Sequence, residues 1–100
     1  MLIIILVADV FRALDDKTRR IILDELTASD GKSLFEICAL LTARHGLGST
    51  RQAISQHLEI LESAGLIETE RRGRHKFHFF KSEPLVEITR RWPTTGKDSQ

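Results

Sequence analysis

The sequence predicts a mainly helical (α+β) fold in the order α-α-α-α-β-β-α, and three observations lead to this class. Apolar residues recur at helical spacing in five segments. After Gly65 the pattern changes to the alternation of short strands. The 100 residues, 41% of them hydrophobic, are enough for one compact core but not for two. We therefore expect a single domain over residues 1–93, followed by a disordered tail over residues 94–100.

The first predicted helix spans residues 2–14 and is apolar on nearly every side. Its helical stripe consists of Ile3, Val7, Val10, Phe11 and Leu14, while Leu2, Ile4, Ile5 and Leu6 fill the other faces. A domain of this size has too little surface to cover such a helix alone. The helix is therefore expected to pack against a partner.

Capping residues predict where the next helices begin. Asp15-Asp16 precedes a helix from Lys17 to about Ala28, and residues 29–32 read as a turn. Ser33 and Glu36 have the spacing of a capping box, which opens a third helix. This helix is expected to fade between Thr42 and Gly48, where glycines interrupt the pattern.

The fourth helix follows Ser49 or Thr50 as its N-cap and ends at Gly65. Strands are expected over residues 66–71 and 75–81, joined by Arg72-Gly73-Arg74 as a hairpin turn. Glu83-Pro84 starts a last helix, because proline suits a first turn. Its common face comprises Leu85, Ile88 and Trp92.

The fourth helix carries polar side chains opposite its apolar stripe, and their distribution is uneven. The first two turns hold no acid, whereas Glu59 and Glu62 appear only in the last turns. Arginine and glutamine can pair with base edges in a DNA major groove, where carboxylates would meet phosphates. The predicted DNA-facing residues of this helix are Thr50, Arg51, Gln52, Ser55 and Gln56.

The hairpin is strongly basic, although the whole chain has a net charge of only +1. Between residues 71 and 81 there are no acids, and the cations are Arg71, Arg72, Arg74, Lys76 and Lys81. A protruding basic loop can lie along a phosphate backbone or in a minor groove. The helix and the hairpin together predict a surface for double-stranded DNA.

Three segments resemble the ArsR-type family of winged helix-turn-helix transcriptional regulators. They are residues 11–20, residues 71–74 and the Ser-x-His-Leu-x-x-Leu-x-x-Ala-Gly-Leu run from Ser55 to Leu66. The resemblance covers roughly residues 9–92, and the run is its most specific part.

The resemblance implies a homodimer that binds an inverted-repeat operator and represses transcription. By position, Arg72, Arg74 and Lys76 would lie in the DNA-contacting wing. The expected dimer interface combines the first and last helices through Ile3, Ile4, Val7, Phe11, Leu85, Ile88 and Trp92.

The sequence departs from the family at the positions that bind metal in some members. Those members carry a Cys-x-Cys pair, and Cys38 and Leu40 stand at the equivalent positions here. The last helix offers only Glu83 and Glu87 as potential ligands. We therefore expect no metal site and no cofactor, and no residue pattern specifies an effector. Two further departures are Lys17, where many members have proline, and a longer link over residues 43–50.

Other functional classes are less consistent with these patterns. No catalytic triad, phosphate-cradling glycine loop or carboxylate pair can be assembled, so we expect no enzyme and no catalytic residue. The four histidines lack ligand spacing, so we expect solvent- or phosphate-facing roles, except that His57 is expected to make a structural contact. The alternative function is a winged-helix module that binds protein. The single cysteine and the short apolar runs predict a cytoplasmic protein without a membrane contact.

Overall fold

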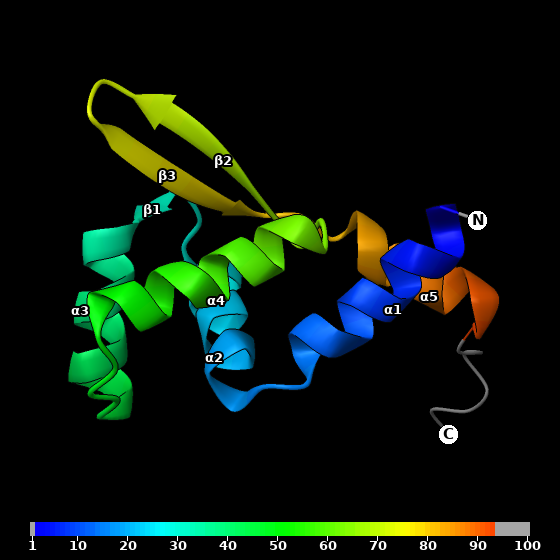
Figure 1. The fold of residues 1–100 in the computed structure, drawn as a ribbon, viewed down its shortest axis with the longest axis horizontal. Helices are drawn as coiled ribbons and strands as arrows, with labels where there is room; N and C mark the ends of the chain where they lie inside the picture. The colour runs from blue at the N-terminus through cyan, green and yellow to red at the C-terminus, as the bar shows by residue number, and fades with distance from the viewer. Residues whose placement is uncertain (1, 94–100) are drawn as a thin grey trace.

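The computed structural model describes the backbone of residues 2–93 and the side chains of residues 8–93. The described helices are α1 (Leu2–Leu14), α2 (Lys17–Ala28), α3 (Leu34–His45), α4 (Arg51–Ser63) and α5 (Glu83–Arg91). The strands are β1 (Lys32–Ser33), β2 (Ile67–Arg72) and β3 (His75–Phe80), which form one antiparallel sheet in the order β1-β3-β2. The fold is therefore mainly helical, with a short sheet at one side (Figure 1).

Side-chain caps begin α2, α3 and α4 at the positions that the sequence predicts. Asp16 accepts the backbone N–H of Arg19, and Thr50 accepts that of Ala53. Ser33 and Glu36 form the full capping box of α3. Because each cap satisfies an orphan amide of the first helical turn, the helix starts are set locally.

The end of α4 is set by a backbone motif at Gly65. This glycine has φ +78°, a left-handed conformation in which a side chain would be strained. The N–H of Leu66 donates to Leu61 and the N–H of Gly65 donates to Glu62, which is the pattern of a Schellman motif. Leu66 is consequently folded back into the core, where it is fully buried.

A single apolar core joins the helices to the base of the sheet. Its largest fully buried side chains come from every helix from α1 to α4 and from the turn before β2, and they are Val10, Ile22, Leu26, Ile37, Leu41, Ile54, Leu61 and Leu66. From α5, Leu85 and Ile88 pack against this core but stay half-buried. The last helix is thus only partly covered by its own chain.

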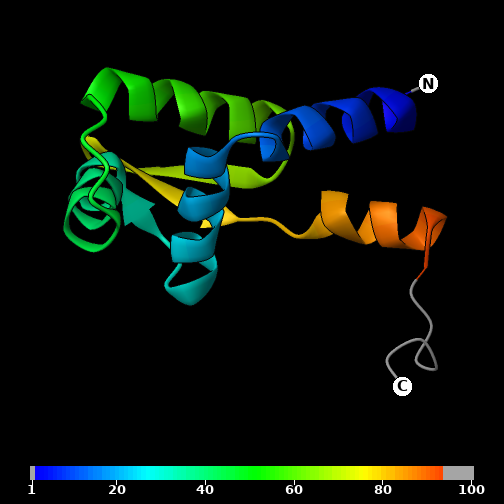
Figure 2. The same cartoon turned by 90° about the horizontal axis from the view of Figure 1, so that it is seen from below.

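The molecule has two distinct ends. In both views α1 and α5 lie side by side at one end, whereas the hairpin β2–β3 projects near α3 and the start of α4 at the other (Figures 1 and 2). We call this hairpin, residues 67–80, the wing. The surface that the sequence predicts for DNA and the one that it predicts for a second copy therefore lie at different ends.

One sequence expectation needs correction. Lys32 is not part of a simple turn, because it pairs with His78 as the first residue of strand β1, and Ser33 continues this strand by pairing with Phe77. Two residues show no periodicity, so the sequence gives no sign of this strand. The expected end of α3 between Thr42 and Gly48 is confirmed, because the helix ends at His45 with Gly46 as a left-handed C-cap, and Glu25 of α2 holds Arg44 and His45 in its last turn. The expected tail, residues 94–100, lies outside the described residues.

Candidate nucleic-acid interface

The N-terminal half of α4 presents polar side chains to solvent. Arg51, Gln52 and Gln56 are exposed, and Ser55 is half-buried on the neighbouring stripe. The first turn of α4 contains no acid, and its backbone amides point toward the exposed end of the helix. The helix dipole adds partial positive charge at this end, which favours an anion. Thr50 is exposed as well, but its hydroxyl oxygen is occupied in capping α4.

The wing is a tight hairpin whose turn consists of Gly73 and Arg74. Arg72 pairs with His75 across the turn, and Gly73 has φ +62°, as the first central residue of a type II′ turn requires. Gly73 has open space around it, with no atom within 4 Å of the position that a Cβ would take. The turn therefore projects into solvent.

A groove of about 610 Å³ separates α4 from the wing. Arg51 and Ser55 line it from α4, and Arg74 and Lys76 line it from the wing. Glu59 lines the groove two turns further along α4. The groove is therefore positively charged near the start of α4 and the wing tip, and negatively charged toward the end of α4.

The cations of the wing differ in availability. Arg72 forms an ion pair with Glu70 on the same strand, and its guanidinium lies 5.6 Å from the centroid of the Phe77 ring. Lys81, directly after the wing, pairs with Glu68 at 3.5 Å. The five basic residues between residues 71 and 81 therefore overstate the free positive charge of the hairpin. Glu68 and Glu70, which lie just before this segment, pair with two of them.

Arg71 belongs to the opposite face of the wing from Arg72. It shares its face with Thr69, whose hydroxyl donates to Glu62 of α4 at 3.1 Å, and it stands directly across from Lys76. Sequence reasoning listed Arg71 among the cations but did not select it as a contact residue. The alternation of side chains along the strand, together with the position of Lys76 across from it, could have predicted that Arg71 shares a face of the wing with Lys76.

A second residue that the sequence did not single out is Phe35, at the start of α3. Its side chain is 68% exposed and lines the groove beside α4. An aromatic side chain this exposed is unusual for a helix with its own buried stripe, and it adds an apolar edge to a mainly polar groove. The capping box at Ser33 places it there, because Phe35 occupies the first turn of α3.

The histidines do not behave uniformly, and the expectation of a solvent- or phosphate-facing role fails for His78, whereas His45 is exposed. His78 is 4% exposed and its Nδ1–H donates to the carbonyl of Lys32 at 2.9 Å. His45 Nε2–H donates to the buried carboxylate of Glu25 at 2.9 Å. His57 makes the structural contact expected for it, since its Nδ1 accepts from Arg19 at 3.1 Å.

These roles have electrostatic consequences. Burial lowers the pKa of His78 below its usual value, against a smaller opposing effect of the bond to Lys32. The hydrogen bond from His45 lowers the pKa of Glu25, which is also close to Arg44. Both groups are therefore held in their unprotonated forms and serve as structural links between elements.

The predicted dimer residues divide into two groups. Phe11 and Trp92 are exposed by 49% and 57%, whereas Leu85 and Ile88 are half-buried against their own core. Val86, which the sequence analysis did not select, is 41% exposed on α5. The side chains of Ile3, Ile4 and Val7 lie outside the described residues.

The structure offers few features of a chemical site beyond the groove. Burial raises the pKa of the half-buried Cys38 thiol, despite the charge of Arg51 nearby, so this thiol is not activated. Among the side chains described, histidine, cysteine and acidic groups nowhere gather in threes at a spot that could hold a metal ion. None of the described helices has both the length and the apolar character that crossing a bilayer demands.

Comparison with known proteins places this architecture in a family. A family model described as a helix-turn-helix domain matches residues 14–70. The HTH-type transcriptional regulator YuzN of Bacillus subtilis is 42% identical over 83 residues, which are 83% of this chain and 90% of that protein. The HTH-type transcriptional regulator MJ1325 of Methanocaldococcus jannaschii is 31% identical over 81% of this chain and 84% of its own length.

A solved structure agrees with the sequence relatives. An ArsR-like transcriptional regulator from Rhodococcus sp. RHA1 superposes with a TM-score of 0.71 at 33% identity, covering 94% of this chain and 82% of that one. The matched residues of the helix-turn-helix family model take in α2, α3, α4 and the start of β2. The chain therefore belongs to the ArsR-like winged helix-turn-helix transcriptional regulators.

Proposed function

We propose that this regulator acts in the cytoplasm as a homodimeric repressor, with each protomer reading one half of an inverted-repeat operator in double-stranded DNA. The observation that supports this most directly is the groove between α4 and the wing. The start of α4 and the tip of the wing both border it, and the side chains that they contribute, Arg51, Arg74 and Lys76, are exposed cations. We assign both DNA binding and dimerisation to one domain, residues 1–93.

The proposal assigns base recognition and phosphate binding to different residues. Gln52 and Gln56 are one turn apart on the exposed face of α4, where amide side chains can form two hydrogen bonds with an adenine edge. Arg51 and Ser55 flank them toward the groove. Arg74 and Lys76 of the wing contact phosphates, which position the protein without reading sequence. Arg72 contributes less, since Glu70 neutralises it.

The proposed dimer uses the end of the molecule that lies away from the wing. No side chain described in α5 is buried, and Phe11, Val86 and Trp92 are exposed large apolar groups. Exposed apolar patches of this kind mark protein interfaces. A two-fold dimer through α1 and α5 would cover them and present two copies of α4 to the same side of a duplex.

The experiment selects sequences from a random pool of duplex DNA and then measures affinity for the recovered sequence. Gln52→Ala and Gln56→Ala are each expected to weaken binding by about 1 to 3 kcal/mol and to relax the sequence preference at one position. Lys76→Ala should weaken binding to all DNA about equally and reduce the salt slope by about 1.

A matched control removes the same charge elsewhere. Lys17 is exposed on α2 and lines a different pocket, beside Leu85 of α5, so Lys17→Ala should leave both the affinity and the salt slope unchanged. If binding by the unmodified protein shows no salt dependence, the contact is not with phosphates. In that case the alternative module, which binds an acidic protein through the wing, would be favoured.

A further inference from the structure

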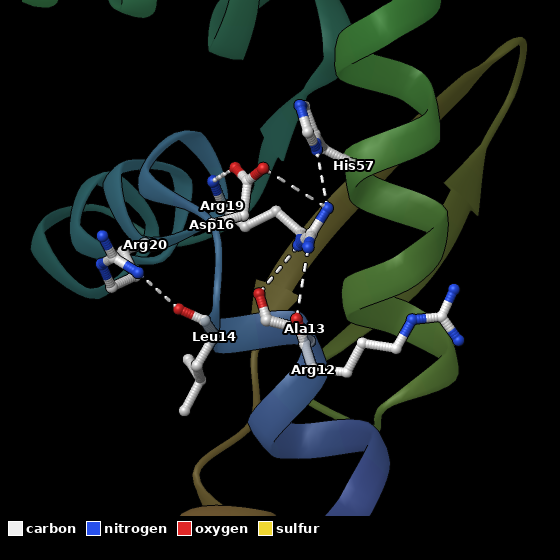
Figure 3. Close-up of polar contacts among 7 residues, drawn as sticks. All are labelled: Arg12, Ala13, Leu14, Asp16, Arg19, Arg20 and His57. Atoms are coloured by element: carbon white, nitrogen blue, oxygen red, sulfur yellow. Dashed lines mark hydrogen bonds and ion pairs between the residues drawn. The ribbon is translucent and has the colours of Figure 1, made fainter.

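The side chain of Arg19 lies at the junction of three helices. Arg19 is only 9% exposed although it is charged, and its side chain extends from α2 toward both the end of α1 and the middle of α4 (Figure 3). Burying an arginine is unfavourable unless its donors are satisfied. The partners of this guanidinium therefore show what the residue holds together.

On one side, Arg19 caps the last turn of α1. Nε donates to the carbonyl of Ala13 at 2.8 Å and Nη2 donates to the carbonyl of Arg12 at 3.2 Å. Both carbonyls belong to the final turn of α1 and have no partner within the helix, although that of Arg12 also accepts from the N–H of Asp15, directly after the helix. A cation at this end also complements the negative end of the helix dipole.

On the other side, the same guanidinium reaches α4. Nη1 of Arg19 donates to Nδ1 of His57 at 3.1 Å and lies 3.9 Å from the carboxylate of Asp16, the N-cap of α2 (Figure 3). An arginine can only donate, so Nδ1 of His57 must be the acceptor and its proton must lie on Nε2. His57 directly follows Gln56, a proposed base-contacting residue.

This polar bridge joins α1 and α4 where apolar packing is incomplete. Asp9 and Arg12 of α1 face Glu59 and Ser63 of α4 across a second groove of about 190 Å³. The two helices therefore do not interlock along the whole length of their contact. A fixed hydrogen bond beside such a gap limits how far α4 can rotate relative to α1.

We propose that Arg19 is a positioning residue which, through His57, fixes the orientation of the DNA-reading helix α4 relative to the dimerising helix α1. The inference rests on the proposed function. If α1 joins two protomers and α4 reads DNA, the angle between these helices sets the distance between the two copies of α4. The Arg19–His57 bond would then determine which spacing of half-sites the dimer accepts, whereas the side chains of α4 determine the half-site sequence.

The chain supplies a matched control in the adjacent residue. Arg20 is also an arginine of α2, and it donates to the carbonyl of Leu14 at 2.6 Å, again in the last turn of α1 (Figure 3). No contact to α4 is found for Arg20 among the described residues. A comparison of Arg19 with Arg20 therefore separates the bridge to α4 from the capping of α1.

The test is a parallel selection from random-sequence duplex DNA, performed with the full chain and read for two quantities. One is the half-site sequence, and the other is the distribution of spacings between half-sites. The unmodified protein, Arg20→Met and His57→Asn are expected to select a single spacing, because asparagine still offers an oxygen near the position of Nδ1. His57→Leu should select the same half-site sequence over several spacings and bind the best operator about tenfold more weakly.

Arg19→Met is expected to behave as His57→Leu does, but it also removes the donors to the carbonyls of Arg12 and Ala13 and can fail to fold. His57→Leu decides the matter, since it keeps Arg19 and its bonds to α1. A single unchanged spacing for His57→Leu would overturn the inference, and so would loss of the half-site sequence, which would show that His57 supports α4 itself. If the unmodified protein selects no sequence, the proposed function is overturned together with this inference.

Discussion

His78 shows how a single side chain ties the wing to the rest of the domain. It stands on β3, is almost fully buried, and donates through Nδ1–H to Lys32 of β1. Lys76 on the same strand adds a nearby positive charge. Burial has the largest effect on the pKa of His78, and it favours the neutral ring against the opposite effects of the bond to Lys32 and the charge of Glu62.

This environment predicts that mild acid destabilises the fold through His78. Its pKa in the folded protein is below the ordinary value of 6.5, so the unfolded chain takes up the proton first as the pH falls. The contribution of His78 to stability is complete above pH 6.5 and is lost as the pH falls below it. Urea denaturation at about pH 7.5 and about pH 5.5 should show this loss.

The matched variant is His78→Asn, which keeps an N–H donor but does not titrate. Its stability is expected to be lower at both pH values, because a smaller side chain leaves a cavity, but to change less between them than that of the unmodified protein. Equal pH dependence in the two proteins would contradict the role given to His78.

Glu25 links two elements, α2 and α3, and it holds the last turn of α3 in place. Its buried carboxylate accepts from Arg44 at 3.0 Å and from His45 at 2.9 Å, both in the last turn of α3. Leu47 follows and packs against the core, so the link to α4 leaves α3 in a fixed direction. The geometry of the helix-turn-helix therefore depends on an ion pair between α2 and α3.

Acid titration tests this link. The pKa of Glu25 is lowered below its ordinary value of 4.5, first by the hydrogen bond from His45 and also by the charges of Arg44 and His45. A lowered carboxyl pKa stabilises the fold above pH 4.5, and this contribution disappears as the pH falls through the folded-state pKa. Between pH 6 and pH 3.5, thermal unfolding of Glu25→Gln should depend less on pH than that of the unmodified protein. The free energy of unfolding that is lost at pH 3.5 should be smaller in the variant by about 1 kcal/mol or more. An unchanged pH profile would exclude Glu25 as the link.

The elements also show which parts of the structure the sequence could predict. Helix starts were predictable because Asp16, Ser33 and Thr50 cap them with atoms only a few residues away. The buried stripes followed from periodicity in the same way. Strand β1 was not predictable, because its two residues owe their conformation to pairing with β3.

The candidate site, too, was only partly predictable from the sequence. The acid-free start of α4 and the basic hairpin are visible in the sequence, because their residues are contiguous. Three other features depend on which segments meet in space. They are the contacts that engage Arg72 with Glu70 and Phe77, the exposure of Phe35, and the bridge from Arg19 to His57. These contacts have no local pattern, so they emerge only from the folded molecule.

At the scale of the whole molecule, the two ends perform different tasks in the proposed function. The wing occupies one end, and α1 and α5 occupy the other (Figure 2). The groove borders the wing, whereas the exposed Phe11 and Val86 belong to α1 and α5. This separation lets two protomers join without covering the surface proposed for DNA. It also makes the joining region, around Arg19, the place where changes at one end can affect the other.

The proposed assembly predicts how a charge in the apolar end acts. Phe11→Asp places a carboxylate on an exposed aromatic position of α1, which should dissociate the dimer because an unpaired charge is costly to bury. Light scattering at micromolar concentration should report a dimer for the unmodified protein and a monomer for the variant. Phe35→Asp, an equal change at the other end, should leave the dimer intact. A monomeric unmodified protein would refute the assembly.

The central claim is that the start of α4 and the tip of the wing contact DNA together. The most direct measurement is to titrate the isotopically labelled protein with a selected operator duplex and to map the shifted NMR signals. We predict that the largest shifts fall on Arg51, Gln52, Gln56, Arg74 and Lys76, with residues such as Lys17 unaffected. Shifts confined to α5, or to the face of the wing that carries Arg72, while the signals of α4 stay unchanged, would contradict this claim.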